Sequence, residues 1–118
     1  MNHQIPTINL LRTAVESRDA SSLKSFYADD AVLTIIDSDN PPSRPRTLKG
    51  AREIGEFLDD VCARDMTHTI ESGAIEGNTL AFLQGCRYGD GTRVMASSVA
   101  ELGPEGIVRQ TTVQAWDS

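Results

Sequence analysis

The sequence has little of the chemistry that would assign a function at sight. Its two cysteines, Cys62 and Cys86, show no CxxC spacing and stand in no cluster with histidine, so we expect buried thiols rather than metal ligands. Of the two histidines, His3 lies near the start of the chain, far from His68, and no metal-ligand spacing is present. We therefore expect no metal and no other cofactor.

A long apolar run and a basic surface are also missing. No stretch approaches the length of a membrane span, and no charged-then-apolar segment opens the chain, so we expect a soluble, cytoplasmic protein. The net charge of −6 argues against nucleic acid or an anionic membrane as a partner, because both select a basic surface. A chain of 118 residues is long enough for one domain, residues 1–118, with a real core.

The second half of the chain is rich in strand signals. Two-residue alternation, β-branched residues and glycine-bearing turns predict four strands: 66–76, 78–88, 92–102 and 107–116. Turns this short join only antiparallel neighbours, so these strands should form an antiparallel meander. The run 80–83 (LAFL) is apolar on both faces, which indicates a strand covered on both sides.

The first half is predicted to be mainly helical. An apolar stripe predicts a helix over about 6–17, and Asp19 is a good N-cap for a short second helix that ends near Tyr27. Valine and isoleucine predict a strand over 31–36. A third helix follows Gly50, because the apolar side chains occur at i, i+3, i+4 and i+7: Ile54, Phe57, Leu58 and Val61.

The segment 37–46 (DSDNPPSRPR) is predicted to be an irregular loop. Its prolines remove backbone donors, and its polar residues favour turns. Such a loop is longer than most connections and is a candidate rim for a pocket. Arg44 and Arg46 lie on it and would either meet an anionic ligand or be ordinary solvated charges.

Three helices ahead of a four-stranded meander predict an α+β domain with helices on one face of the sheet. The order of the elements, with the phrases YADDAV at 27–32 and LKGAREI at 48–54, resembles the SnoaL-like group of the nuclear-transport-factor-2-like superfamily, which includes ketosteroid isomerase. The resemblance covers nearly the whole chain. It implies a cone-shaped α+β barrel of cystatin-like topology, in which three N-terminal helices pack on a strongly curved antiparallel sheet around a mostly apolar cavity.

The same resemblance implies a small organic molecule as ligand and a homodimer formed through the outer face of the sheet. It does not imply one activity, because this fold hosts isomerases, cyclases, hydrolases, dehydratases and non-catalytic binders.

The catalytic groups of ketosteroid isomerase are not retained. That enzyme uses a carboxylate base with a tyrosine and a protonated aspartic acid as oxyanion donors. Counted from the YADDA phrase, these positions hold Ile35, Leu11 and Ser98. Of the supporting tyrosines Tyr27 is present but Leu58 replaces the other, while Trp116 matches an aromatic lining position. The resemblance therefore supports a similar cavity wall, while the missing catalytic groups argue against proton transfer by the ketosteroid isomerase mechanism.

Epoxide hydrolysis, a second reaction of the superfamily, uses an arginine between two carboxylates. Arg109, Glu101 and Asp117 could supply these groups. Strand alternation, however, places Arg109 on the face opposite Gln110, Thr112, Gln114 and Trp116, so we expect it to lie outside.

Two titratable residues are candidate bases. His68 shares a strand face with Met66 and Ile70 and is either a cavity base or a core histidine satisfied by one hydrogen bond. Asp37 ends the first strand on the face of Ile35 and is either a base at the cavity mouth or a turn aspartate bonded to its own backbone.

Neutral polar residues are candidates for the pocket wall: Gln84, Ser98, Thr112 and Gln114. Each would fix a ligand or complete an internal network, provided that the strand register turns Gln84 inward. For Trp116 the sequence favours the core over a ligand platform, although an apolar ring with one N–H donor suits both. Two functions stay open, an isomerase- or cyclase-like enzyme with His68 or Asp37 as base and neutral donors polarising a carbonyl, and a non-catalytic binding or assembly module.

Overall fold

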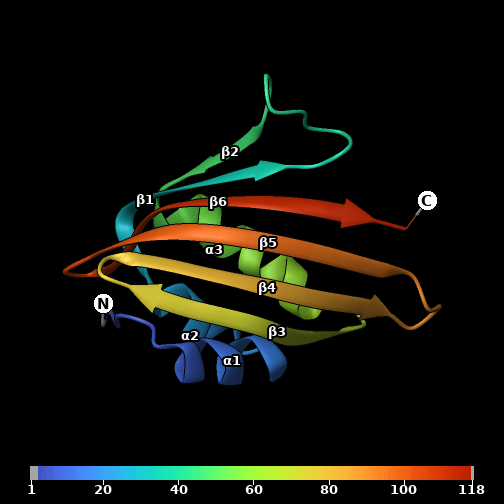
Figure 1. Ribbon diagram of the computed structural model, residues 1–118, viewed down its shortest axis with the longest axis horizontal. Helices are drawn as coiled ribbons and strands as arrows, with labels where there is room; N and C mark the ends of the chain where they lie inside the picture. Colours follow the sequence, from blue (N-terminus) through green and yellow to red (C-terminus); the bar gives the residue numbers. More distant parts are fainter. Residues whose placement is uncertain (1–2, 118) are drawn as a thin grey trace.

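The computed structural model describes residues 3–117, which form three helices and one six-stranded sheet (Figure 1). The helices are α1 (Ile8–Glu16), α2 (Ala20–Ser25) and α3 (Gly50–Ala63). The strands are β1 (Tyr27–Ile36), β2 (Arg46–Lys49), β3 (Met66–Glu76), β4 (Thr79–Tyr88), β5 (Arg93–Gly103) and β6 (Gly106–Trp116). The predicted α+β class and the antiparallel meander β3–β6 are confirmed.

Helix α1 begins later than the sequence pattern predicted. Its N-cap is Thr7, because the hydroxyl oxygen of this residue accepts a hydrogen bond from the Leu10 backbone N–H at 3.1 Å. The apolar stripe of α1 buries Leu11 and Val15 in the core.

Helix α2 and strand β1 meet earlier than predicted. Asp19 caps α2 as expected, because its Oδ1 accepts a hydrogen bond from the Ser22 backbone N–H at 3.1 Å. The helix nevertheless ends at Ser25, and Tyr27 already belongs to β1. Strand β1 is therefore longer than the predicted segment 31–36.

The proline-bearing loop is irregular over 37–45, as predicted, but the residues after it form a strand that the sequence analysis missed. Strand β2 runs antiparallel to β1 and places Leu48 opposite Leu33. It covers the outer edge of β1 before the chain enters α3.

The strand order is β2-β1-β6-β5-β4-β3. Neighbouring strands are antiparallel except β1 and β6, which are parallel, so the predicted antiparallel sheet contains one parallel pair. A parallel pair needs a long crossover, and here the chain between β1 and β6 includes α3 and the rest of the meander.

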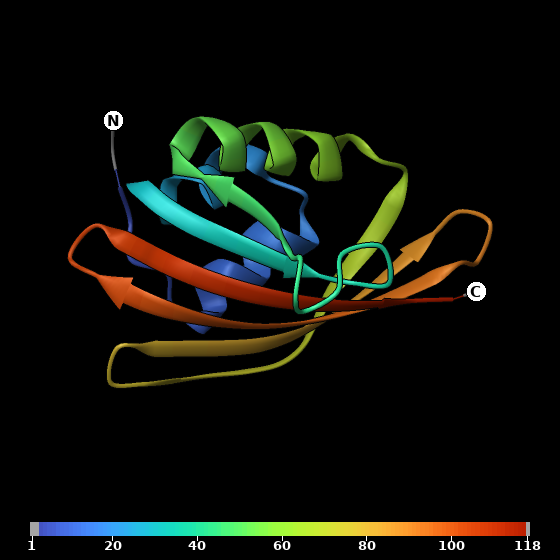
Figure 2. The same ribbon diagram turned by 90° about the horizontal axis from the view of Figure 1, so that it is seen from above.

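The sheet curves strongly, and the helices lie on its concave side (Figure 2). Helix α1 packs on β3, and α3 packs on β1 and α2. The core between these layers is apolar and includes Leu11, Phe26, Leu33, Ile54, Leu80 and Ile107. Among residues 3–117, no helix has both the length and the apolar character needed to cross a membrane.

Strand β4 differs from its prediction on one face. Leu80 and Phe82 point to the core and are buried, whereas Ala81 and Leu83 on the outer face are only half-buried. Cover on both faces is therefore incomplete in the single chain, and the outer face of the sheet carries exposed apolar side chains such as Val99 and Val113.

Candidate functional site

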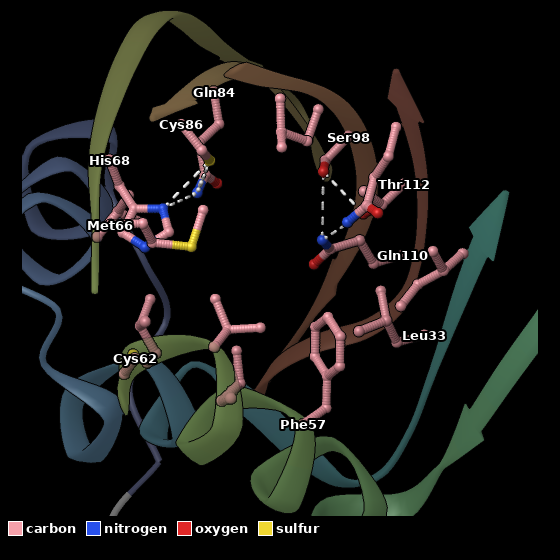
Figure 3. Close-up of a pocket in the computed structure, with 18 of the residues that line it drawn as sticks. Leu33, Phe57, Cys62, Met66, His68, Gln84, Cys86, Ser98, Gln110 and Thr112 are labelled. Atoms are coloured by element: carbon pink, nitrogen blue, oxygen red, sulfur yellow. Dashed lines mark hydrogen bonds between the residues drawn. The ribbon is translucent and has the colours of Figure 1, made fainter. Parts of the chain in front are cut away.

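A cavity of about 220 Å³ lies between the concave face of the sheet and the helices (Figure 3). Most of its wall is apolar, with side chains that include Leu11, Val15, Leu33, Phe57, Leu58, Val61, Met66, Phe82 and Val94. Sites for drug-sized ligands usually measure about 300–1,000 Å³, so this space suits a smaller molecule.

Every residue that the sequence analysis named as a base or wall candidate lines this cavity: Tyr27, Ile35, Asp37, His68, Gln84, Ser98, Thr112, Gln114 and Trp116. They do not form one cluster. Figure 3 shows polar side chains in two groups on opposite sides of the space. One is the histidine cluster, consisting of His68, Gln84 and Cys86, and the other is the hydroxyl network, consisting of Tyr27, Ser98, Gln110 and Thr112.

The hydroxyl network is buried and has a fixed direction. The Tyr27 hydroxyl donates to Gln110 Oε1 at 2.8 Å, so the amide nitrogen of Gln110 faces the other two members. This nitrogen donates to Thr112 Oγ1 at 3.0 Å and to Ser98 Oγ at 3.4 Å. Burial raises the pKa of Tyr27 well above its ordinary value, which keeps its hydroxyl protonated and donating.

One hydrogen of the hydroxyl network is left without an acceptor. Ser98 Oγ and Thr112 Oγ1 lie 2.8 Å apart, and only one of the two can donate across this contact. The hydroxyl hydrogen of the other has no acceptor among residues 3–117. The network therefore offers one O–H donor to a group in the cavity.

The histidine cluster is formed by neighbouring strands. His68 on β3 and Cys86 on β4 are direct cross-strand partners. Gln84 precedes Cys86 by two residues on β4 and therefore lies on the same face. His68 Nδ1 lies 3.1 Å from both Cys86 Sγ and Gln84 Nε2, and Gln84 Nε2 lies 3.4 Å from the same sulfur. The register that turns Gln84 inward is thereby established.

The hydrogen bonds of the cluster determine the tautomer of His68. Because the amide nitrogen of Gln84 faces Nδ1, Nδ1 accepts and the ring proton resides on Nε2. Nε2 is buried and has no hydrogen-bond partner among the described residues. Burial lowers the pKa of His68, and the positive charges of Arg18 and Arg64 lower it further, so the ring is neutral at neutral pH.

Asp37 lies at the mouth of the cavity, and its contacts support the turn role. Its Oδ1 accepts hydrogen bonds from the backbone N–H of Asp39 at 3.0 Å and of Asn40 at 2.9 Å. The side-chain amide of Asn40 donates to the same oxygen at 2.9 Å. These bonds hold Asp37 as an Asx-turn residue, whereas none of them joins it to the histidine cluster.

Trp116 is not the core residue that the sequence favoured. It lies at the cavity mouth and is 44% exposed, with its ring 5.8 Å from that of Tyr88. Its indole N–H donates to Gln114 Oε1 at 3.3 Å, so Gln114 is engaged at the mouth rather than in the hydroxyl network. Arg46 also lies at the wall, with its guanidinium 5.3 Å from the centre of the Phe57 ring.

The positions that correspond to ketosteroid isomerase groups also line the cavity. Leu11, Ile35 and Leu58 are all at the wall, and none of them can titrate. Arg109 points outward, as predicted, with its guanidinium 3.7 Å from the Glu101 carboxylate. Neither superfamily mechanism therefore finds its groups in this cavity.

Sequence reasoning missed two members of the site, Gln110 and Cys86. Alternation along β6 did place Gln110 on the inward face with Thr112 and Gln114, but it was not named as a site residue. Cys86 has the same relation to Gln84 on β4. Its contact with His68 depends on the pairing of β3 with β4, which alternation within one strand does not reveal. The second thiol, Cys62, lines the cavity from α3, and both cysteines are half-buried and free.

The architecture is that of a nuclear-transport-factor-2-like protein. A protein of this kind with unknown function from Mesorhizobium loti is similar, with 12% identity, a TM-score of 0.75 and cover of 98% of this chain and 99% of that one. A protein named provisionally as a ketosteroid isomerase, from Kribbella flavida, has 15% identity, a TM-score of 0.74 and cover of 93% and 74%. An uncharacterised protein with a cystatin-like fold from Silicibacter pomeroyi has 20% identity, a TM-score of 0.72 and cover of 93% and 74%.

Within this architecture, the chain belongs to the SnoaL-like domain family, whose sequence profile matches residues 9–110. The structural similarities are below 25% identity and show the shared fold alone. No curated protein matches the chain significantly.

Proposed function

We propose that this chain is a small-molecule pocket protein of the isomerase or cyclase kind, which binds a mainly apolar carbonyl compound and moves one of its protons with His68. The observation that supports this most strongly is the state of His68. The side chain is 7% exposed at the cavity wall, and its Nε2 has no partner within residues 3–117. Buried polar atoms are nearly always hydrogen-bonded, so this nitrogen calls for a polar group in the cavity.

The opposite wall supports a carbonyl as the group that is bound. The spare hydroxyl hydrogen of Ser98 or Thr112 requires an acceptor, and a carbonyl oxygen is one. The part of the molecule that lies between the two polar groups should be neutral, because the pKa of His68 is lowered and that of Tyr27 raised, so neither group carries a charge at neutral pH. Its remaining surface should be apolar to match the rest of the wall.

Gln84 provides a route from binding to proton transfer. When its amide oxygen faces His68, Nδ1 carries the proton and Nε2 becomes the base. A half-turn of the amide exchanges oxygen and nitrogen at nearly the same positions, so the change of tautomer needs no movement of the wall. Nε2 would then take the proton beside the carbonyl while the hydroxyl donor stabilises the enolate oxygen.

Exchange of ligand protons with deuterium tests this proposal without knowledge of the natural substrate. A small cyclic ketone such as cyclohexanone is incubated with the protein in D2O, and the loss of its α-protons is followed by NMR. We expect the wild-type chain to accelerate exchange by at least about a hundredfold over the His68→Ala variant, the usual scale for a positioned general base. Equal exchange by the two folded proteins would refute the catalytic role.

The alternative is a non-catalytic binding or assembly module. Two observations favour it: no carboxylate contacts His68 among the described residues, and the proton on Nε2 makes His68 a donor rather than a base. A module of this kind would bind ketones, seen as shifts of cavity resonances, without accelerating α-proton exchange. The same experiment therefore separates the two functions.

We also propose that the protein is a homodimer in the cytoplasm that pairs through the outer face of its sheet. Apolar side chains of β4, β5 and β6 are neighbours on this face, where Ala81 pairs with Val99 and Ser97 pairs with Val113. Val99 and Val113 are 54% and 49% exposed in the single chain. A second copy would cover this patch and complete the burial of β4 that its sequence predicts.

A further inference from the structure

Two thiols line the same cavity in different surroundings. Cys86 Sγ lies 3.1 Å from His68 Nδ1 and 3.4 Å from Gln84 Nε2, whereas Cys62 on α3 has no imidazole contact among residues 3–117. Figure 3 shows Cys86 and His68 together on one side of the space and Cys62 on the helix below it. The proposed proton transfer uses the imidazole and leaves the sulfur of Cys86 without a role.

The hydrogen bonds of the histidine cluster arrange Cys86 as a nucleophile with its own base. His68 Nδ1 has one lone pair, and the Cys86 sulfur and the Gln84 amide nitrogen both lie 3.1 Å from it, so the thiol hydrogen can be donated to Nδ1 when the amide hydrogen turns to the sulfur. The Gln84 amide nitrogen also lies 3.4 Å from the sulfur, so one of its hydrogens can be donated there. The amide therefore stabilises negative charge that develops on the sulfur while the imidazole takes the proton.

The resting state of this pair is neutral. Burial raises the pKa of the Cys86 thiol, and burial also lowers the pKa of His68. A preformed thiolate is therefore disfavoured, and the sulfur becomes nucleophilic only when the proton moves to Nδ1 during attack. Such a pair selects an electrophile held in the cavity over reagents in bulk water.

From this geometry we infer that Cys86 and His68 form a covalent capture site for small α,β-unsaturated carbonyl compounds. The sulfur bonds to the β-carbon, and the carbon–carbon π bond breaks as the thiol proton passes to Nδ1. The resulting imidazolium returns a proton to the α-carbon, so the net reaction adds S–H across the double bond. No oxidant, reductant or metal is required.

The other features of the cavity suit this class of electrophile. An α,β-unsaturated ketone has one carbonyl oxygen to accept the spare hydroxyl hydrogen of Ser98 or Thr112, and polarising this carbonyl activates the β-carbon. A small member of the class, such as 2-cyclohexen-1-one, is of a size that suits a cavity of about 220 Å³. The inference rests on the proposed function only in requiring that a carbonyl compound enters this cavity.

The test compares the two thiols within one protein, so that Cys62 is the control for Cys86. The wild-type chain is incubated with 2-cyclohexen-1-one, and the adduct at each cysteine is followed by peptide mass spectrometry. We expect Cys86 to react at least about tenfold faster than Cys62, because Cys86 alone of the two has an imidazole in contact among residues 3–117. Equal rates, or faster reaction at Cys62, would overturn the inference.

A His68→Gln variant then tests the imidazole. It should slow the adduct at Cys86 by about tenfold or more and leave the rate at Cys62 unchanged. An unchanged rate at Cys86 in a folded variant overturns the role of His68 as the base. If the variant does not fold, the ratio of the two thiols in the wild-type chain still decides the question.

Cyclohexanone, the saturated counterpart, separates this inference from the proposed function. If cyclohexanone shifts the cavity resonances but the unsaturated ketone forms no adduct at Cys86, the capture site is refuted and carbonyl binding stands. If the adduct forms at Cys86 without α-proton exchange, the capture site stands and the isomerase-like proposal fails. If neither ketone binds or reacts, both are refuted.

Discussion

The phenolic hydroxyl of Tyr27 donates a hydrogen bond to the side-chain oxygen of Gln110 at 2.8 Å inside the protein. This bond links the first residue of β1 to β6 and fixes the orientation of the Gln110 amide. Because the amide oxygen is held by Tyr27, the amide nitrogen faces Ser98 and Thr112. Tyr27 thus determines which way the hydrogen bonds of the hydroxyl network run, and with them the spare hydroxyl hydrogen of Ser98 or Thr112.

Replacing Tyr27 by phenylalanine removes this donor and keeps the ring. Gln110 Oε1 is then buried without its partner, which should lower the free energy of unfolding by about 1–3 kcal/mol. Denaturant unfolding measures the change. Tyr88→Phe is the matched control, because the Tyr88 hydroxyl accepts from half-buried Arg64 at 3.0 Å nearer the surface and should matter less. Equal losses in the two variants would contradict the importance of the buried network.

The lowered pKa of His68 makes stability depend on pH. In the folded chain this pKa lies below 6.5, its ordinary value, so the unfolded chain takes up the proton first as the pH falls below 6.5. The stabilising contribution is complete above 6.5 and is lost as the pH falls through the folded pKa. The wild-type chain should therefore lose more stability between about pH 7.5 and pH 5 than His68→Gln, by about 1.4 kcal/mol for each unit of pKa difference.

Unfolding at both pH values measures this difference, and subtraction of the variant removes the contributions of all other groups. NMR titration of the His68 ring provides a direct check. A midpoint at or above 6.5 would contradict the effect of burial.

The sequence carried enough information for the meander and for the inward face of each of its strands. Alternation placed His68 beside Met66 and Ile70, and the glycine-bearing turns separated the strands. Strand β2 could not be predicted in the same way, because its four residues bury only Leu48 and show no full period of alternation. Trp116 was misjudged because its large apolar ring favours burial, while its place at the end of β6 leaves it at the cavity mouth.

Which residues of the site contact one another was harder to predict from the sequence than where the site lies. Contact between His68 and Cys86 requires the register of β3 against β4, and this register shifts between Ile70 and Ser72. A local irregularity of this kind depends on the packing of the whole sheet. The unpartnered Nε2 and the spare hydroxyl hydrogen are likewise properties of completed networks, and no segment of the chain reveals them by itself.

Gly106, the first residue of β6, packs closely against the backbone of Phe26 at the end of α2. Its φ is 111°, and an added Cβ would collide with the carbonyl oxygen of Phe26, which accepts the Ile107 backbone N–H at 2.7 Å. Gly106→Ala should cost about 3 kcal/mol or more, because backbone strain and a steric clash act together. Gly77→Ala is the control: its φ is also positive, at 57°, but an added Cβ meets nothing within 4 Å. The free energy of unfolding of Gly77→Ala should fall by only about 1–2 kcal/mol. Denaturant unfolding compares the two, and equal losses would show that contact with Phe26 is unimportant.

Gln84→Glu places a carboxylate where the amide contacts His68. A negative charge beside Nδ1 favours the protonated ring and holds a proton on Nδ1, so the pKa of His68 should rise by about one unit or more. NMR titration of the ring measures the shift, and Gln84→Met, which removes the polar contact without adding charge, is the control. The same variant should accelerate α-proton exchange of cyclohexanone if Nε2 is the base. A pKa that stays unchanged would mean that the residue at position 84 does not control His68.

The apolar patch on the outer face of the sheet predicts the assembly state. Val99→Asp and Val113→Asp each place a charge in a surface where the proposed partner copy would exclude water, and burying an unpaired charge is strongly unfavourable. Both variants should be monomers at concentrations at which the wild-type chain is a dimer, as measured by analytical ultracentrifugation. Leu10→Asp is the control, because Leu10 is 40% exposed on α1 and lies outside the patch, so this variant should remain dimeric. A monomeric wild-type chain, or a dimer that persists in both valine variants, would contradict the proposed interface. In the second case the partner would have to contact another surface of the protein, and the outer face of β4 would remain only half-buried.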